Sequence, residues 1–175
     1  MTLTDRAAFD ALAERLRHER ADLRDGTRWV VNVGISECSI SKGANDTYSH
    51  LRLQLEESGL AFSLSQVGCG GWCWAEPFVT VSGPGVPRVL YGPVTSDRVP
   101  ELVAAMQRGV VATDLAVGTY DDTAHGEIQP LSTHPFFKQQ TRVLLEHAGE
   151  IDPESIEDYI AVGGYQAMVK VLDEM

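Results

Sequence analysis

Over the first 70 or so residues, the pattern of apolar and polar positions predicts a helix, followed by two strands that a second helix joins. Apolar residues recur at helical spacing over residues 4–24, and Arg and Glu occupy much of the remaining face. Residues 29–34 form a short apolar run and residues 61–67 alternate, and both patterns are typical of strands. The helical pattern between them ends at Gly59, a common closing residue of helices. This order favours a parallel strand pair with a right-handed crossover.

The following segment predicts a hairpin and one more helix. Short strand patterns at residues 78–82 and 88–91 flank a turn rich in Gly and Pro, which favours an antiparallel pair. A helical pattern then covers residues 97–108. The predicted fold class is therefore α/β, with a thioredoxin-like four-stranded mixed sheet, an extra N-terminal helix and a C-terminal helical extension.

These patterns divide the chain into four segments. We expect an N-terminal helix within residues 1–26, a thioredoxin-like domain over 27–109 and an irregular connector over 110–132. Residues 133–175 predict two or three short helices, the first beginning at Pro135. So small a tail cannot bury all of its apolar helix faces against itself. We therefore expect an exposed apolar face that packs against a partner absent from this chain. The side chains expected on this face are Phe137, Leu144, Ile160, Tyr165 and Val169.

Charge and hydropathy narrow the class of protein. The net charge of −11 argues against a nucleic-acid partner, because binding phosphates requires clustered Lys and Arg. No run approaches the roughly 18 apolar residues that a membrane-spanning helix needs, and the N-terminus lacks a signal pattern. We therefore expect a cytoplasmic protein that does not insert into a membrane.

The three cysteines are the candidate site. Cys69 and Cys73 are separated by Gly-Gly-Trp in the loop after the second predicted strand, and Cys38 lies in the loop after the first. Loops after successive parallel strands open at one edge of a sheet, so the three sulfurs are expected to converge there. Thiolates at one edge suit an iron–sulfur cluster or zinc, and buried, chemically inert cysteines are the alternative. The three-residue gap argues against disulfide exchange, which uses a two-residue gap.

Several motifs resemble one known family. These are Gly34-x-x-x-Cys38, the Ser-Lys-Gly-Ala sequence that ends at Ala44, Gly-Cys-x-Gly-x-Cys-x-x-x-Pro ending at Pro77, Arg-Val-Leu-Tyr-Gly-x-Val-Thr and Val-Pro-Glu-Leu-Val. They resemble the thioredoxin-like [2Fe–2S] ferredoxin domain of the NADH-binding flavoprotein subunits in complex I-type NADH dehydrogenases, NAD-linked formate dehydrogenases and bifurcating hydrogenases. The tail, with its His-Pro-Phe-Phe-Lys-Gln-Gln motif and residues 149–170, resembles the segment that leads into the flavin domain of those subunits.

The resemblance implies a cofactor and its ligands. Cys38, Cys69 and Cys73 match three of the four cysteines that bind a [2Fe–2S] cluster in this family. Asn32 and Val33 stand where the remaining cysteine belongs, so we expect one of them to face a vacant ligand position. The nearest substitute is Ser36 or Ser39, and a cluster bound in this way is expected to be labile.

The resemblance also implies a function and partners. The chain is expected to be an electron-transfer domain of an NADH-dependent oxidoreductase complex, with no catalytic residue of its own. Because it stops at Met175, before the expected flavin and NADH loops, we expect a shortened or split subunit, with FMN, NAD and a [4Fe–4S] cluster on a partner domain or subunit. Other iron–sulfur subunits are further expected partners. The alternatives are a metal-free docking module and a zinc module that uses three cysteines with a water or His.

Overall fold

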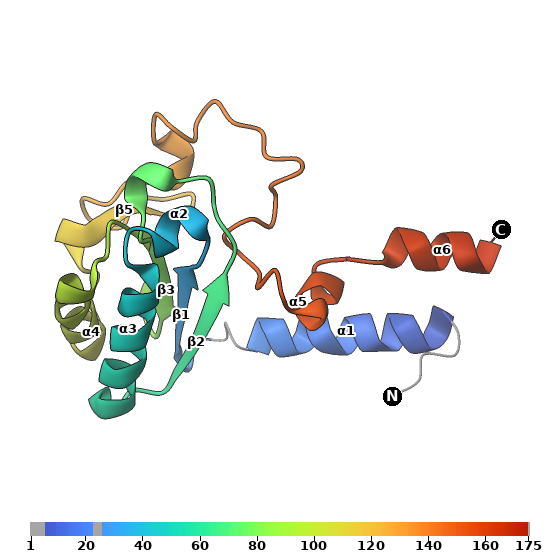
Figure 1. Cartoon of the computed structure of the whole chain (residues 1–175), viewed down its shortest axis with the longest axis horizontal. Helices are drawn as coiled ribbons and strands as arrows, with labels where there is room; N and C mark the ends of the chain where they lie inside the picture. The colour runs from blue at the N-terminus through green and yellow to red at the C-terminus, as the bar shows by residue number, and fades with distance from the viewer. Residues whose placement is uncertain (1–5, 23–25, 175) are drawn as a thin grey trace.

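The first helix of the described residues stands away from the sheet (Figure 1). The structure, a computed structural model, describes residues 6–22 and 26–174. The predicted helix 4–24 is observed as α1, Arg6–Asp22, and its outermost predicted residues lie outside the described ranges. Three residues of α1, spaced to share one face, are buried: Phe9, Ala13 and Leu16.

The strands form one mixed sheet in the order β2-β1-β3-β4-β5. β1 (Trp29–Gly34) and β2 (Phe62–Val67) are parallel neighbours, and β3 (Val79–Gly83) and β4 (Val86–Tyr91) form an antiparallel hairpin, which confirms both predicted pairings. The sheet has one strand more than predicted. β5 (Ala116–Thr119) pairs with β4 inside the segment expected to be an irregular connector.

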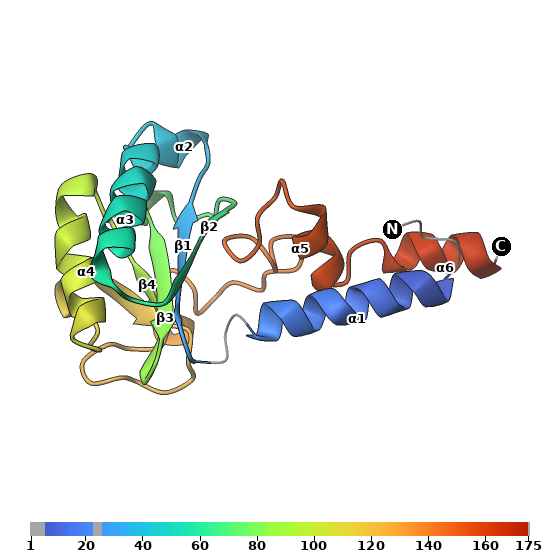
Figure 2. The same ribbon diagram turned by 90° about the horizontal axis from the view of Figure 1, so that it is seen from below.

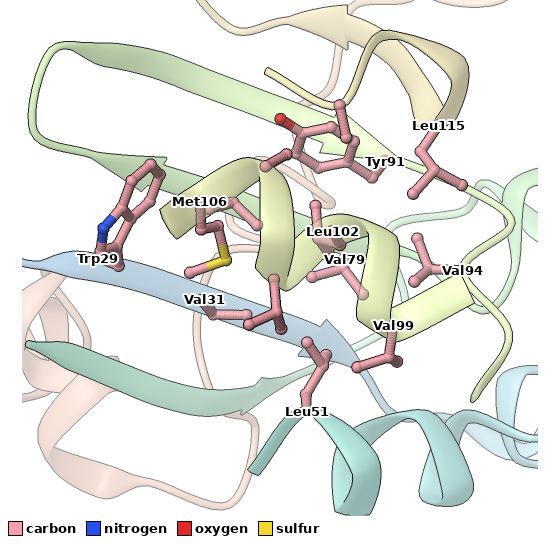
Figure 3. Close-up of a cluster of buried hydrophobic side chains, with 14 of the residues drawn as sticks. Trp29, Val31, Leu51, Val79, Tyr91, Val94, Val99, Leu102, Met106 and Leu115 are labelled. Carbon is pink, nitrogen blue, oxygen red and sulfur yellow. The ribbon is translucent and has the colours of Figure 1, made fainter. Parts of the chain in front are cut away.

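Two helices cover one face of the sheet (Figures 1 and 2). α3 (Ala44–Ser58) crosses from β1 to β2, and α4 (Val99–Gln107) follows β4 after a 3₁₀ turn at Ser96–Arg98. The arrangement is thioredoxin-like, as predicted. The main core lies beneath these helices, and Figure 3 shows side chains from the helices and the sheet meeting there. Examples are Leu51 of α3, Leu102 of α4, Val31 of β1, Val79 of β3 and Tyr91 of β4.

The opposite face of the sheet carries a second, smaller core. Phe78 and Leu90 pack there with Trp72 and with Leu131, which belongs to a 3₁₀ turn at Leu131–Thr133. Another 3₁₀ turn, Thr113–Leu115, precedes β5. The segment after β5 therefore folds back over the sheet and supplies part of its cover.

The tail is less helical than predicted. The helix expected from Pro135 is observed as a series of turns, and regular helices appear only at α5 (Ile156–Ala161) and α6 (Gln166–Glu174). Leu144 and Leu145 of the predicted stripe are 98% and 57% exposed, so this part of the stripe has no surface to pack on. A short helix without tertiary packing is only marginally stable in water, which accounts for the difference.

α1 is the packing partner of the tail helices. Both views show α1 beside α5 and α6, which together form an arm that extends from the sheet (Figures 1 and 2). Ile160 is only 5% exposed because it packs against the buried face of α1, so its predicted exposure was wrong. Leu144 and Tyr165 are exposed, as predicted, whereas Phe137 and Val169 are half-buried.

Candidate metal centre

The three cysteines meet at one edge of the sheet. Cys38 lies in α2 (Glu37–Ile40), the short helix after β1. Cys69 follows β2 after Gly68, and Cys73 begins a 3₁₀ turn at Cys73–Ala75. Their Sγ atoms all lie within 4.8 Å of one another, which confirms the predicted convergence. They are the one group of this kind among the described His, Cys, Asp and Glu residues.

An oxygen atom lies beside these sulfurs. The Ser36 Oγ is 3.2 Å from the Cys38 Sγ, and the two groups share a hydrogen bond. This bond is the main reason why the pKa of Cys38 is lowered from its ordinary value. Ser39 holds the turn in place, because its Oγ accepts from the Ser36 N–H at 2.8 Å and donates to the Ser36 carbonyl at 3.0 Å. The sequence could not decide between the two serines, and the structure places Ser36 next to sulfur.

The loop around Cys69 directs a backbone donor at sulfur. The N–H of Gly71 donates to the Cys69 Sγ over 3.3 Å. Gly71 has a φ of +82°, a conformation that residues with a Cβ rarely adopt. A Cβ at Gly70 would lie 2.8 Å from the Trp72 ring. Both glycines are therefore required by the local geometry.

Two charged groups border the sulfurs. The Lys42 ammonium donates to the carbonyl oxygen of Cys73. The Glu76 side chain is 2% exposed, with one oxygen accepting from the Phe78 N–H at 3.2 Å and the other without a hydrogen-bond partner among the described residues. Burial raises the pKa of Glu76. The pKa of Cys73 is also raised, chiefly by its hydrogen bond with Cys38. The sequence pattern does not point to Lys42 or Glu76, because only the folded loops bring them here.

Asn32 and Val33 are engaged elsewhere. The Asn32 amide donates to the Thr80 Oγ1 at 3.3 Å, and Asn32 lines a small cavity of about 50 Å³ beneath Arg20. Val33 is fully buried in the main core, under the helices. The expectation that one of them faces a vacant ligand position therefore finds no support in the structure.

Aromatic side chains lie on both sides of the cysteine loop, buried on the inner side and exposed on the outer side. Trp72 is buried and contacts the rings of Phe78 and Phe137 edge-on. Trp74 is 46% exposed and its ring stacks on that of His134, with the planes 4° apart. Trp72 therefore shields the inner side of the loop from water, whereas Trp74 lies on the accessible side next to Cys73.

Comparison with known proteins gives the family. No protein-family model matches the sequence. Over 86 residues the chain is 31% identical to the NADP-reducing hydrogenase subunit HndB of Solidesulfovibrio fructosivorans, covering 49% of this chain and 68% of HndB. This chain belongs to the HndB family. That relationship agrees with the resemblance to hydrogenase and NADH-flavoprotein-type subunits seen in the sequence motifs.

Other similar proteins cover different shares of the chain. HndC, another NADP-reducing hydrogenase subunit of the same organism, is 54% identical over 35 residues, which are 20% of this chain and only 7% of HndC. Two structures of thioredoxin-like [2Fe–2S] ferredoxin from Aquifex aeolicus give TM-scores of 0.48 and 0.44 at 18% and 19% identity. They cover 54% and 53% of this chain and 94% and 99% of the ferredoxin chains.

The donor atoms can be compared with what each metal group needs. A [2Fe–2S] cluster takes four protein ligands, and the cysteines supply three. A single tetrahedral ion with metal–sulfur bonds of about 2.3 Å holds its sulfurs about 3.8 Å apart, whereas sulfurs on different irons lie farther apart than that. A spread within 4.8 Å fits a single ion directly and a two-iron cluster after a small opening of the loops. The cysteines therefore fit a thiolate metal centre, and a two-iron cluster needs one more donor.

Proposed function

We propose that this chain is an electron-transfer domain of an NADH-dependent oxidoreductase complex. The observation that carries the proposal is the convergence of Cys38, Cys69 and Cys73 within 4.8 Å in a member of the HndB family. HndB is named as a subunit of an NADP-reducing hydrogenase, so a redox complex that uses a nicotinamide is the relevant context. The proposed cofactor is a [2Fe–2S] cluster bound by the three cysteines.

When bound, such a cluster would supply one-electron transfer. The residues around it have separate roles in this proposal. Hydrogen bonding from the Gly71 N–H and the nearby positive charge of Lys42 offset the negative charge of thiolates. Trp72 excludes water on the inner side of the loop. Cys73 is exposed and lies next to the exposed Trp74, so this side is the proposed route for electron exchange with a partner.

The arm is the proposed connection to the rest of the complex. Its tail helices expose Ile156, Tyr159, Met168 and Leu172 between 47% and 76%, a set of apolar side chains that suits a protein partner. The resemblance of the tail to the segment that leads into a flavin domain supports a flavoprotein partner domain or subunit, which we propose carries FMN, the NAD site and a [4Fe–4S] cluster. The HndC match, to another hydrogenase subunit, agrees with a partner subunit in general. In the domain division that we propose, residues 1–26 and 133–175 serve this connection, and the sheet domain extends past 109 to include β5.

Metal and sulfide analysis of anaerobically prepared protein tests the cofactor. The proposal expects about two iron and two acid-labile sulfide per chain, with visible absorption lost in a variant in which all three cysteines are alanine. One zinc without sulfide would replace the proposal with the zinc module. Equal absence of metal from the wild type and from the triple variant would leave the metal-free docking module.

The docking module rests on one specific observation. None of the described cysteines supplies the fourth thiolate, and Asn32 and Val33 are engaged in the sheet and the core. In this second function, the thioredoxin-like domain would seat the flavoprotein on another subunit without transferring electrons. Co-purification with the flavoprotein, unchanged in the triple cysteine variant, would be its signature.

A further inference from the structure

We infer that Ser36 is the fourth protein ligand of this centre, bound through its side-chain oxygen. The inference rests on the proposed function, since it names the donor that a [2Fe–2S] cluster still lacks. A tetrahedral metal with one sulfur ligand at about 2.3 Å and one oxygen ligand at about 2.0 Å holds the two atoms about 3.5 Å apart. The observed separation of 3.2 Å between the Ser36 Oγ and the Cys38 Sγ is close to that of two ligands on one metal.

The positions of the four ligands in the sequence group them in pairs, one pair on each loop. Ser36 and Cys38 belong to the same turn after β1 and would share one iron. Cys69 and Cys73 belong to the loop after β2 and would share the other. Because the two pairs lie on different loops, the cluster would bridge them. The opening that a two-iron unit requires would then be a shift between the two loops.

The neighbouring polar side chains are bound to other groups. Ser39 is fully buried, and its Oγ donates to the backbone carbonyl of Ser36 and accepts from the Ser36 hydroxyl at 3.3 Å. The Ser41 Oγ donates to the carbonyl oxygen of Cys38 over 2.8 Å, away from the sulfur. The Asn32 amide donates to Thr80. Ser36 is therefore the hydroxyl in contact with sulfur.

Binding through Ser36 requires the loss of its proton. The O–H bond breaks as the metal–oxygen bond forms, and the proton leaves to solvent together with those of the cysteine thiols. A serine oxygen is a harder and more basic donor than a thiolate. It favours ferric over ferrous iron and is more readily protonated, so the cluster should have a lower reduction potential and be lost more easily in air than one with four thiolates.

Four variants reconstituted anaerobically with iron and sulfide test the inference. Ser36→Cys is expected to retain the cluster several-fold longer in air, to gain thiolate-to-iron absorption and to raise the reduction potential. Ser36→Ala should lose most of its iron. Ser41→Ala, which removes a hydroxyl from the same turn, is the matched control and should resemble the wild type. Val33→Cys should also resemble the wild type, because its side chain would lie in the core. Circular dichroism of each metal-free variant establishes that the fold is intact.

The outcomes separate the two proposals. A wild type that binds the cluster, with Ser36→Ala and Ser36→Cys unchanged in iron content, absorption and lifetime, would overturn the role of Ser36 and leave the proposed function standing. A cluster in Ser36→Cys but none in the wild type would also overturn it, since serine would then not serve as a ligand. Absence of iron and sulfide from every variant would overturn both. A gain in Val33→Cys without a gain in Ser36→Cys would place the fourth ligand on β1 instead.

Discussion

Arg142 donates a hydrogen bond of 2.9 Å from its Nη2 to the carbonyl oxygen of Gly70. Gly70 lies between Cys69 and Cys73, and the Arg142 guanidinium also lies 5.6 Å from the centre of the Trp72 ring. The tail is therefore attached directly to the loop that carries two of the candidate ligands.

Replacing Arg142 with alanine should loosen the cysteine loop. A hydrogen bond from a charged, partly buried group contributes about 1–2 kcal/mol, so amide exchange at Gly71 and Trp72 should accelerate roughly 5- to 30-fold in the metal-free protein. Lys138→Ala removes an exposed cation from the same segment and should leave the exchange rates unchanged. Equal rates in wild type and Arg142→Ala would show that the tail does not stabilise the loop.

Two leucines on α3 provide a test of the main core. Leu51 is fully buried and Leu53 is 59% exposed. Leu51→Ala should lower the free energy of unfolding by about 2–5 kcal/mol, because it removes packed atoms and leaves a cavity. Leu53→Ala should change it by less than about 0.5 kcal/mol. Urea denaturation followed by circular dichroism measures both values.

Ile160 tests the arm in the same way. It is 5% exposed against α1, whereas Leu172 of α6 is 76% exposed. Ile160→Ala should destabilise the packing of α5 on α1 by about 2–3 kcal/mol and speed amide exchange in α1, with the sheet domain unaffected. Leu172→Ala should have no such effect. If Ile160→Ala leaves the amide exchange rates in α1 unchanged, this contact does not stabilise the arm.

The buried carboxyl of Glu76 should make the free energy of unfolding depend on pH. Burial raises the pKa of its carboxyl above the ordinary value of 4.5, so the folded state favours the protonated form. The protonated carboxyl contributes its full stabilisation at a pH below the pKa of Glu76 in the unfolded chain. This stabilisation is lost as the pH rises through the pKa of Glu76 in the folded protein. Metal-free Glu76→Gln lacks this loss, so its stability relative to the wild type should increase from pH 4 to pH 8. Thermal denaturation across this range, with exposed Glu57→Gln as the control, measures the difference.

The Ser36 hydroxyl should control the reactivity of Cys38 in the metal-free protein. Its hydrogen bond is the main cause of the lowered pKa of Cys38. Ser36→Ala should therefore raise that pKa and shift the pH midpoint for alkylation of Cys38 by iodoacetamide upward. Peptide mapping by mass spectrometry assigns the reaction to each cysteine. An unchanged midpoint would contradict the assigned hydrogen bond.

The convergence of the cysteines could be predicted because it depends on topology alone. Once residues 29–34 and 61–67 are parallel neighbours, the loops after them open at the same edge. β5 could not be predicted in this way. Its sequence, Ala-Val-Gly-Thr, is short, and it forms a strand because the edge of β4 is available for pairing.

Contacts between residues far apart in the sequence explain the remaining differences. Periodicity identified the apolar face of residues 156–161 but could not show that α1 covers it, since α1 lies more than 130 residues earlier. The same limit applies to Ser36. Its place beside the Cys38 sulfur depends on how the Ser39 side chain holds the turn. A sequence pattern does not show such a local contact.

The pairing of α1 with α5 also has a consequence for biosynthesis. α1 leaves the ribosome before the sheet domain, whereas the residues that cover Phe9, Ala13 and Leu16 are made only after the sheet domain has been synthesised. Because domains generally fold in order from the N-terminus, the sheet can form while this face of α1 is still exposed to water. During translation the nascent chain therefore presents an uncovered apolar helix, a suitable target for a chaperone, until Ile160 emerges.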